Sequence, residues 1–136
     1  MMRDTRIRRL PMALSALVAL ALAVHDLLTS GKLAASPLIT PVAAVSCGLV
    51  KGRPLLDLAY IEDSVADADV NVVQTLAGHL VEVQGTAEGA AFPRAQLDQL
   101  LDLANIGNAQ LFAAQQAALA QVMSPAAQAA LVTTPD

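Results

Sequence analysis

The longest regular pattern in the sequence is a helical stripe from about Arg94 to Gln121. Apolar or small residues recur in it at positions 97, 100, 104, 107, 111, 114 and 118. These steps of three and four predict one packed face of an α-helix, with Asp98, Asp102 and Asn105 on the face toward water. At about 1.5 Å per residue the helix is roughly 40 Å long, which is enough to cross a four-stranded sheet. We therefore expect the stripe to pack against a sheet and to supply much of the core.

Apolar runs ahead of this helix predict a first hairpin. Val42 to Val50 is almost continuously apolar, and the Lys-Gly-Arg-Pro sequence at 51–54 predicts the turn that follows it. A second strand is predicted from Leu55 to Ile61, pairing back on the first. Alternation along this second strand places three side chains on one face, namely Leu56, Leu58 and Tyr60.

A second hairpin and an amino-terminal helix complete the predicted fold. Strands are predicted at 70–75 and 80–84, joined by a short turn. A helix is predicted from about Met12 to Leu28, followed by a proline-containing linker at 32–41. The fold class is therefore α+β: a four-stranded, mostly antiparallel sheet covered by an Ala/Leu-rich amino-terminal helix and a long carboxy-terminal helix.

The amino terminus supports two interpretations. Residues 1–9 are basic and residues 10–24 carry no charge, which imitates a secretory signal peptide. The uncharged run is shorter than the about 20 apolar residues that a membrane span needs. It also fits a buried helix, so the pattern alone leaves both export and burial open.

Charge and cysteine content exclude several classes of protein. The chain has 8 Lys and Arg against 12 Asp and Glu, a net charge of −4, and much of the positive charge lies at the amino terminus. Because phosphate binding needs clustered bases, this balance argues against a dedicated nucleic-acid module, and bound RNA would need bases from elsewhere. Cys47 is the single cysteine, and His25 and His79 are far apart. A disulfide scaffold and a Cys/His zinc site are therefore excluded.

Candidate chemistry concentrates in the acidic stretch from Asp57 to Asn71, which holds five carboxylates and no base. At about 6 Å and an effective dielectric near ~20, one carboxylate pair repels by roughly 3 kcal/mol, and a divalent cation would reverse that sign. Mg²⁺ prefers carboxylate oxygens and usually takes one or two of them. Asp63 and Asp69 could supply this pair if the loop between them folds back. The alternative is a solvated acidic loop that binds no metal.

Several segments resemble the bacterial ribonuclease PH family, and their order and gaps agree with it. The similarity extends from about Ala13 to Ala120. The segments that carry it are Val42-Ala43-Ala44-Val45-Ser46 with Gly48, Leu56-Asp57-Leu58, Glu62-Asp63-Ser64 with Asp69, Asn71-Val72-Val73, and Glu82-Val83-Gln84-Gly85-Thr86-Ala87-Glu88-Gly89.

The resemblance implies a phosphorolytic 3′-to-5′ exoribonuclease, a tRNA nucleotidyltransferase that trims the 3′ ends of transfer-RNA precursors. Inorganic phosphate attacks the terminal phosphodiester and releases a nucleoside diphosphate. By resemblance, Asp63 and Asp69 bind Mg²⁺, and Asp69 is the better candidate for a direct catalytic part. The family also implies a cytoplasmic homo-oligomer, a ring of six subunits, with no membrane involved.

The sequence departs from the family at its amino terminus. A Gly-Thr-Arg segment that helps to bind phosphate in the family would place its Thr-Arg at Met12-Ala13, where both side chains are absent. The amino-terminal half of the family is missing as well. We therefore expect an unrelated basic leader at 1–11, a ribonuclease PH-like carboxy-terminal half domain at 12–121 and a loosely ordered tail at 122–136. The resemblance also favours a buried helix over export.

These departures leave two functions open. The first is a phosphorolytic exoribonuclease whose isolated carboxy-terminal half has little or no activity and depends on the missing half. The second is a non-catalytic remnant that at most associates with full-length subunits.

Overall fold

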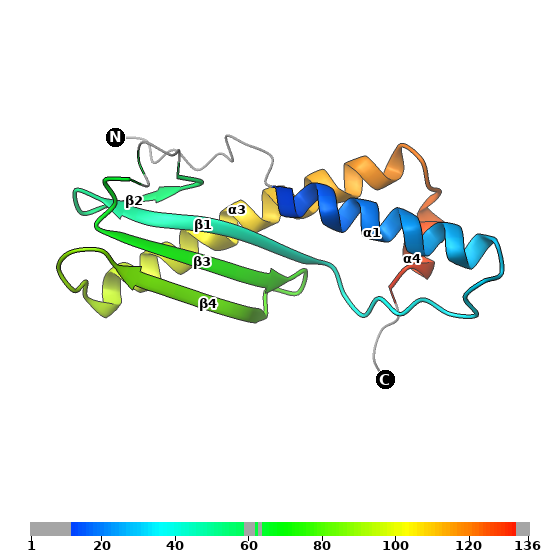
Figure 1. The fold of residues 1–136 in the computed structure, drawn as a ribbon, viewed down its shortest axis with the longest axis horizontal. Coiled ribbons are helices and arrows are strands. Elements are labelled where there is room, and N and C mark those ends of the chain that lie inside the picture. The colour runs from blue at the N-terminus through cyan, green and yellow to red at the C-terminus, as the bar shows by residue number, and fades with distance from the viewer. Residues whose placement is uncertain (1–11, 59–61, 63, 133–136) are drawn as a thin grey trace.

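The computed structural model describes residues 12–58, 62 and 64–132, which form one sheet with helices behind and beside it (Figure 1). In chain order the elements are α1 (Met12–Thr29), β1 (Val42–Val50), β2 (Arg53–Leu56), β3 (Ala68–Thr75), β4 (Leu80–Ala87), α3 (Arg94–Ala120) and α4 (Pro125–Ala130). The predicted α+β fold is confirmed.

The four strands pair antiparallel throughout, in the order β2-β1-β3-β4. β1 and β3 form the centre of the sheet, where Val45 lies opposite Val72. β4 is an edge strand, and all of its residues are exposed. The strands of the second hairpin are longer than predicted, since β3 begins at Ala68 and β4 continues to Ala87.

Alternation along β1 and β3 gives the sheet one buried face and one polar face. On the buried face the strands pack against α3, which crosses behind the sheet (Figure 1). Side chains in this layer are almost fully removed from water, which is the main favourable contribution to folding. The two central strands, β1 and β3, contribute these buried side chains: Ala43, Val45, Cys47, Leu49, Ala68, Val70 and Val72.

The predicted stripe on α3 is confirmed in its first half and shifts in its second half. Buried positions in the first half include 100, 104, 107 and 111, as predicted. The three polar residues expected on the water face are exposed: Asp98, Asp102 and Asn105. In the second half Asn108 and Gln115 are buried, because their amide N–H groups donate to the carbonyl oxygens of Val72 and Val42. Amide hydrogen bonds, rather than apolar contacts alone, therefore attach this part of α3 to the sheet.

The second strand of the first hairpin ends earlier than predicted. β2 ends at Leu56, whereas the sequence predicted a strand that continues through 59–61, which lie outside the described residues. Asp57 has a positive φ of 54°, and this conformation breaks the alternation of a strand. Leu56 is buried in the core, whereas Leu58 packs near Gly48 on the opposite face, so the prediction that the two leucines share a face is wrong. A Cβ at Gly48 would lie 2.5 Å from Leu58 Cδ1 and 2.7 Å from the Ala68 carbonyl oxygen, and because the backbone oxygen cannot easily move, this packing needs glycine there.

A smaller hydrophobic cluster lies beyond the end of the sheet. There α1 runs beside the carboxy-terminal half of α3 and ends at Thr29, shortly before Gly31 with its φ of 70° (Figure 1). Four buried residues join α1 to the segment after α3, namely Ala21, Val24, Met123 and Leu131. No helix among the described residues is long and apolar enough to cross a membrane.

The segment that the sequence suggested to be loosely ordered contains the short helix α4. Ser124 caps it, since Ser124 Oγ accepts a hydrogen bond from the Ala127 N–H at 3.2 Å. Pro125 occupies the first turn, where its missing N–H does no harm. Leu131, just after α4, is buried, and its carbonyl oxygen accepts a hydrogen bond from Ser36 Oγ. The segment is therefore attached to the linker between α1 and β1.

Candidate active site

The polar face of the sheet, opposite the face that α3 covers, carries the candidate site. In the register Asp69 of β3 lies between Gly48 of β1 and Thr86 of β4. Facing residues of antiparallel strands project to the same side, so these positions form one row across the sheet. Asp69 is half-buried, and its Oδ1 atom is enclosed by the protein.

Asp67 holds the strand ends around this row together. Its backbone N–H donates to the Leu49 carbonyl oxygen at 2.6 Å, and its carbonyl oxygen accepts from the Glu88 N–H at 3.0 Å. Its Oδ2 atom accepts from the Gly52 N–H at 3.3 Å. One acidic residue of the stretch therefore has a structural role, because it ties the β1–β2 turn and the end of β4 to the start of β3.

Asp57 approaches β1 from the side opposite to β3. Its backbone N–H donates to the Ser46 carbonyl oxygen at 2.9 Å, directly after β2 ends. Burial, followed by the negative charges of Asp69 and Asp57, raises the pKa of the Cys47 thiol from 9.0 to about 12. Both carboxylates are therefore within electrostatic range of the same β1 residue. The structure brings Asp57 and Asp69 to one end of the sheet.

The predicted pairing of Asp63 with Asp69 stays a prediction. Asp63 lies outside the described residues, whereas Asp69 is placed on the polar face as described above. Among the residues that the structure describes, no group of three or more His, Cys, Asp or Glu is placed to hold a metal ion.

A second polar row lies beside Asp69, and the sequence analysis gave its residues no role. Asn71 of β3 lies opposite Ser46 of β1 and Gln84 of β4. Ser46 Oγ donates a hydrogen bond to Asn71 Oδ1. The signal in the sequence was the two-residue period, which places Asn71 on the same face as Asp69 once the strand is extended. This row gives the site neutral polar groups beside its carboxylates.

Within the part of the chain that the structure describes, positive charge is scarce around the site. Lys51 is exposed in the turn between β1 and β2, and Arg53 is exposed at the first position of β2. Gly48 of β1 pairs with Asp69, and Val50, two residues later on β1, pairs with Arg53. Both bases therefore lie at the same end of the sheet as Asp69. Two exposed bases beside several carboxylates hold an anion weakly, since exposed charge pairs contribute little in water.

The comparisons with known proteins place this sheet in one family. Residues 40–107, which include β1 to β4 and the first half of α3, match the family described as "3′ exoribonuclease family, domain 2". The chain is similar to a protein named Ribonuclease PH from Cereibacter sphaeroides, with 54% identity over 102 residues, which are 75% of this chain and 43% of the relative. Proteins of the same name from Roseobacter denitrificans and a Cyanothece species are each 52% identical over 76% of this chain and 44% of their own length. The chain thus spans less than half the length of these curated relatives.

Proposed function

The chain belongs to the 3′ exoribonuclease family, and on this basis we propose that it supplies the carboxylate half of a ribonuclease PH-type active site. The observation that carries the proposal is the position of Asp69. It lies on the polar face of the sheet, in a row with Gly48 and Thr86, inside the segment that matches the family. Asp57 lies at the same end of the sheet and adds a second carboxylate.

The proposed reaction is phosphorolysis at the 3′ end of an RNA, with a transfer-RNA precursor as the substrate. An oxygen of inorganic phosphate forms a bond to the terminal phosphorus. The bond from that phosphorus to the 3′ oxygen of the preceding nucleotide breaks, and this oxygen leaves with the shortened RNA. The terminal nucleotide is released as a nucleoside diphosphate. No covalent intermediate with the protein is needed, and the site offers oxygen ligands rather than a nucleophile with its base.

The residues present are compatible with Mg²⁺, which we propose is held by Asp63 and Asp69. The donors at this end of the sheet are carboxylate, amide and hydroxyl oxygens, which are the ligands that this ion prefers. Cys47 does not compete as a soft ligand, because it is buried on the α3 face and its raised pKa disfavours the thiolate form that a metal would bind. When bound, Mg²⁺ would offset the repulsion between two phosphates and stabilise charge on the leaving 3′ oxygen.

Phosphate binding by this chain alone is expected to be poor. In the described part of the site the bases are Lys51, in the turn after β1, and Arg53, at the start of β2, and both are exposed. Two anionic substrates must nevertheless come together beside carboxylates, and this needs positive charge in addition to a metal. We therefore propose that the isolated chain has little or no phosphorolytic activity, and that it acts in the cytoplasm within a homo-oligomer, a six-membered ring in the family.

A mixing experiment tests this proposal. The chain would be combined with the part of the Cereibacter sphaeroides relative that the match does not cover, together with a transfer-RNA precursor, phosphate and Mg²⁺. We expect nucleoside diphosphates from the mixture and none from either part alone, with the release lost when phosphate is omitted. Release by this chain alone at the rate of an intact relative would refute the proposal, as would a mixture that forms a complex without any trimming.

The second candidate function is a non-catalytic subunit that only associates with longer relatives. Its support is the large apolar surface beyond the sheet, where Leu20 and Leu76 are 50% and 60% exposed. Under this alternative the mixture forms a complex, and phosphate-dependent trimming stays at background.

A further inference from the structure

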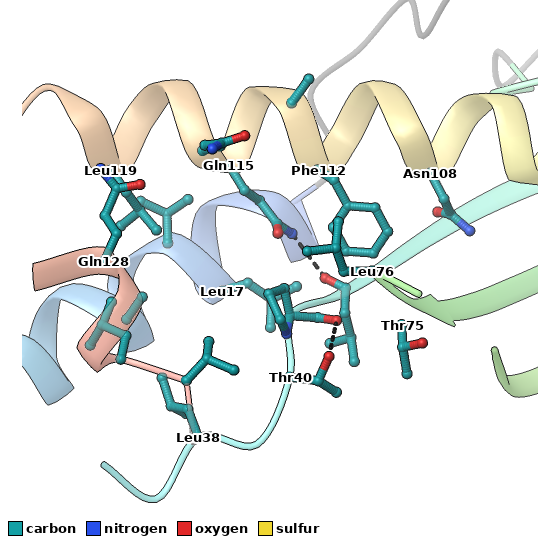
Figure 2. A pocket seen from close by; sticks show the side chains of 18 of the residues that line it. Leu17, Leu38, Thr40, Thr75, Leu76, Asn108, Phe112, Gln115, Leu119 and Gln128 are labelled. Atoms are coloured by element: carbon teal, nitrogen blue, oxygen red, sulfur yellow. Dashed lines mark hydrogen bonds between the residues drawn. The ribbon is translucent and has the colours of Figure 1, made fainter. Parts of the chain in front are cut away.

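The buried amides of α3 hold the helix on the sheet. Asn108 Nδ2 donates to Gln74 Oε1 at 2.7 Å. Gln115 Nε2 donates to the Val42 carbonyl oxygen at 2.9 Å (Figure 2). These residues line an open groove of about 1020 Å³ between α1, α4 and the carboxy-terminal half of α3, and none of the described residues around it carries a charge. The hydrogen bonds of these two amides therefore serve the fold.

Asn71 differs from these amides, because it lies on the polar face of the sheet beside Asp69. It is half-buried in the central strand β3, between Val70 and Val72, whose side chains are fully buried on the other face. Asparagine is depleted in strands, where β-branched and aromatic side chains pack better. Strand stability therefore does not explain an asparagine in the middle of the sheet.

Ser46 fixes the orientation of the Asn71 amide. From the neighbouring strand β1, Ser46 Oγ donates a hydrogen bond to Asn71 Oδ1. An asparagine amide has one accepting oxygen and a nitrogen with two N–H donors, and the serine engages the oxygen. Among the described residues the Asn71 nitrogen has no acceptor. The pair therefore presents an oriented N–H donor on the polar face.

The charges around Asn71 determine which substrate group this donor suits. In one direction along β3, the next position on the polar face is Asp69. In the other direction, the next row of the sheet contains Glu82 of β4, which is exposed. A phosphate at Asn71 would therefore lie between two carboxylates and be repelled by both, whereas a neutral hydroxyl group would not.

Spacing along β3 indicates which hydroxyl group can reach this donor. Successive positions on one face of a strand are about 7 Å apart. With the reacting phosphate beside Asp69, the sugar that carries the leaving 3′ oxygen can reach Asn71 within one such step. The 2′-hydroxyl of this sugar is on the carbon next to the leaving oxygen, and it is the group that distinguishes RNA from DNA.

We infer that Asn71 binds the 2′-hydroxyl of the nucleotide that precedes the scissile phosphate, and that Ser46 is the positioning residue that orients Asn71. The Asn71 N–H donates to the 2′ oxygen, and the 2′ O–H faces the leaving 3′ oxygen. This second hydrogen bond strengthens as negative charge develops on the 3′ oxygen, so the site favours a ribose over a deoxyribose there. The choice of this nucleotide rests on the proposed function.

Trimming of two matched substrates tests the inference, in the mixture of this chain with the remainder of the Cereibacter sphaeroides relative. The two RNAs differ only in a single 2′-deoxy nucleotide just before the terminal one. We expect the all-ribose RNA to be trimmed about tenfold faster, the effect of one hydrogen bond, and Asn71→Ala to reduce this ratio below about twofold. Because the ratio compares two substrates on one protein, a partial loss of folded protein does not change it.

Variants of Ser46 test its positioning role. Ser46→Ala should lower the ribose preference about threefold, because the amide is no longer oriented, and Ser46→Thr should restore it by keeping the hydroxyl group. The KM for inorganic phosphate should stay within about twofold of the unsubstituted chain in both variants, since the inferred contact is to the sugar. A preference that Ser46→Ala leaves unchanged would overturn the role of Ser46.

Gln84→Ala is the matched control, because it removes an exposed amide from the same row of the sheet. It should keep the ribose preference. The inference is overturned if the unsubstituted chain trims both RNAs equally, if Asn71→Ala keeps the preference, or if Gln84→Ala abolishes it as well. It is also overturned if Asn71→Ala raises the KM for phosphate and leaves the preference unchanged, which would place phosphate at this position.

A binding measurement separates this inference from the proposed function. Trimming without a ribose preference would overturn the inference and leave the proposed function intact. If the mixture trims neither RNA, the proposed function fails, and fluorescence anisotropy of this chain with the same two RNAs decides the inference. The all-ribose RNA should then bind about threefold more tightly, and Asn71→Ala should remove the difference. Equal dissociation constants, or no binding of either RNA, would overturn the inference.

Discussion

The two hydrophobic clusters of this chain differ in how completely they exclude water. Between the sheet and α3, Cys47, Val70 and Leu100 have no exposed surface. Between α1 and α4, Ala21 is 9% exposed and Met123 is 6% exposed, and the open groove lies beside them. The first cluster is a closed core, whereas the second borders an open groove.

This difference separates what the chain builds alone from what, on the proposed function, it builds with a partner. The closed core fixes β1 and β3, and thereby places Asp69 and Asn71 on the polar face without outside help. The incomplete cluster fixes only one face of α1. We therefore expect mutations to have opposite consequences in the two regions, affecting folding in one and association in the other.

The largest effect on stability should come from the closed core. Leu100→Ala removes a fully buried side chain that packs on the sheet, and we expect a loss of about 2–5 kcal/mol in the free energy of unfolding. Urea unfolding followed by circular dichroism measures it. Val122→Ala, at a site that is 64% exposed, should change this free energy by less than about 0.5 kcal/mol. Equal effects at the two sites would show that the closed core does not determine stability.

The sequence predicted the closed core better than the region beyond it, for a physical reason. Apolar side chains that are buried recur every second residue in a strand and every three or four residues in a helix, so the spacing of apolar residues predicts which positions are buried. The α3 positions 100, 104, 107 and 111 follow this rule. Buried amides such as Asn108 and Gln115 do not follow that pattern, because their place is set by carbonyl groups elsewhere in the chain. The end of β2 was missed because a positive φ at Asp57 leaves no mark in the spacing of apolar residues.

The candidate site was predictable in part. The sequence singled out the acidic stretch and Asp69, and the structure places Asp69 on the polar face. It could not distinguish Asp67, which ties strand ends together, from carboxylates available for chemistry. Pairing of Ser46 with Asn71 depends on the register of β1 and β3, which spacing within one strand does not fix.

The second-largest expected effect concerns catalysis at the polar face rather than folding of the core. In the mixture with the remainder of a relative, Asp69→Asn should lower phosphate-dependent trimming at least ~100-fold, or about 2.7 kcal/mol in activation free energy. The neutral amide is similar in size but loses the charge that would hold Mg²⁺. Asp102→Asn, exposed on α3, is the matched control and should retain activity. Retained activity in the Asp69 variant would exclude it from the site.

A smaller effect concerns the pH dependence of the closed core. The pKa of Cys47 is raised from 9.0 to about 12 in the folded chain. Between these values the unfolded chain loses the thiol proton and the folded chain keeps it, so stability should fall as pH rises, by up to ~1.4 kcal/mol per pH unit. Cys47→Ala removes this contribution and should give a shallower slope above pH 9 in urea unfolding. Parallel slopes for the two proteins would contradict the burial of the thiol.

The smallest effect belongs to the incomplete cluster. Ser124→Ala removes the cap of α4, and we expect α4 to lose about 1 kcal/mol of local stability, seen as faster amide exchange in 125–130. Ser124→Asn keeps a capping acceptor and should exchange almost as slowly as the wild type. An equal acceleration in β1 or β3 would mean that the two clusters unfold as one unit.

Amide hydrogen exchange of this chain, alone and with the remainder of the Cereibacter sphaeroides relative, tests the contrast between the two regions most directly. We predict strong protection of β1, β3 and the first half of α3 in both samples, and protection of α1 that rises only in the mixture. Equal protection of α1 and β1 in the chain alone, or a mixture that protects the sheet and leaves α1 unchanged, would contradict the account.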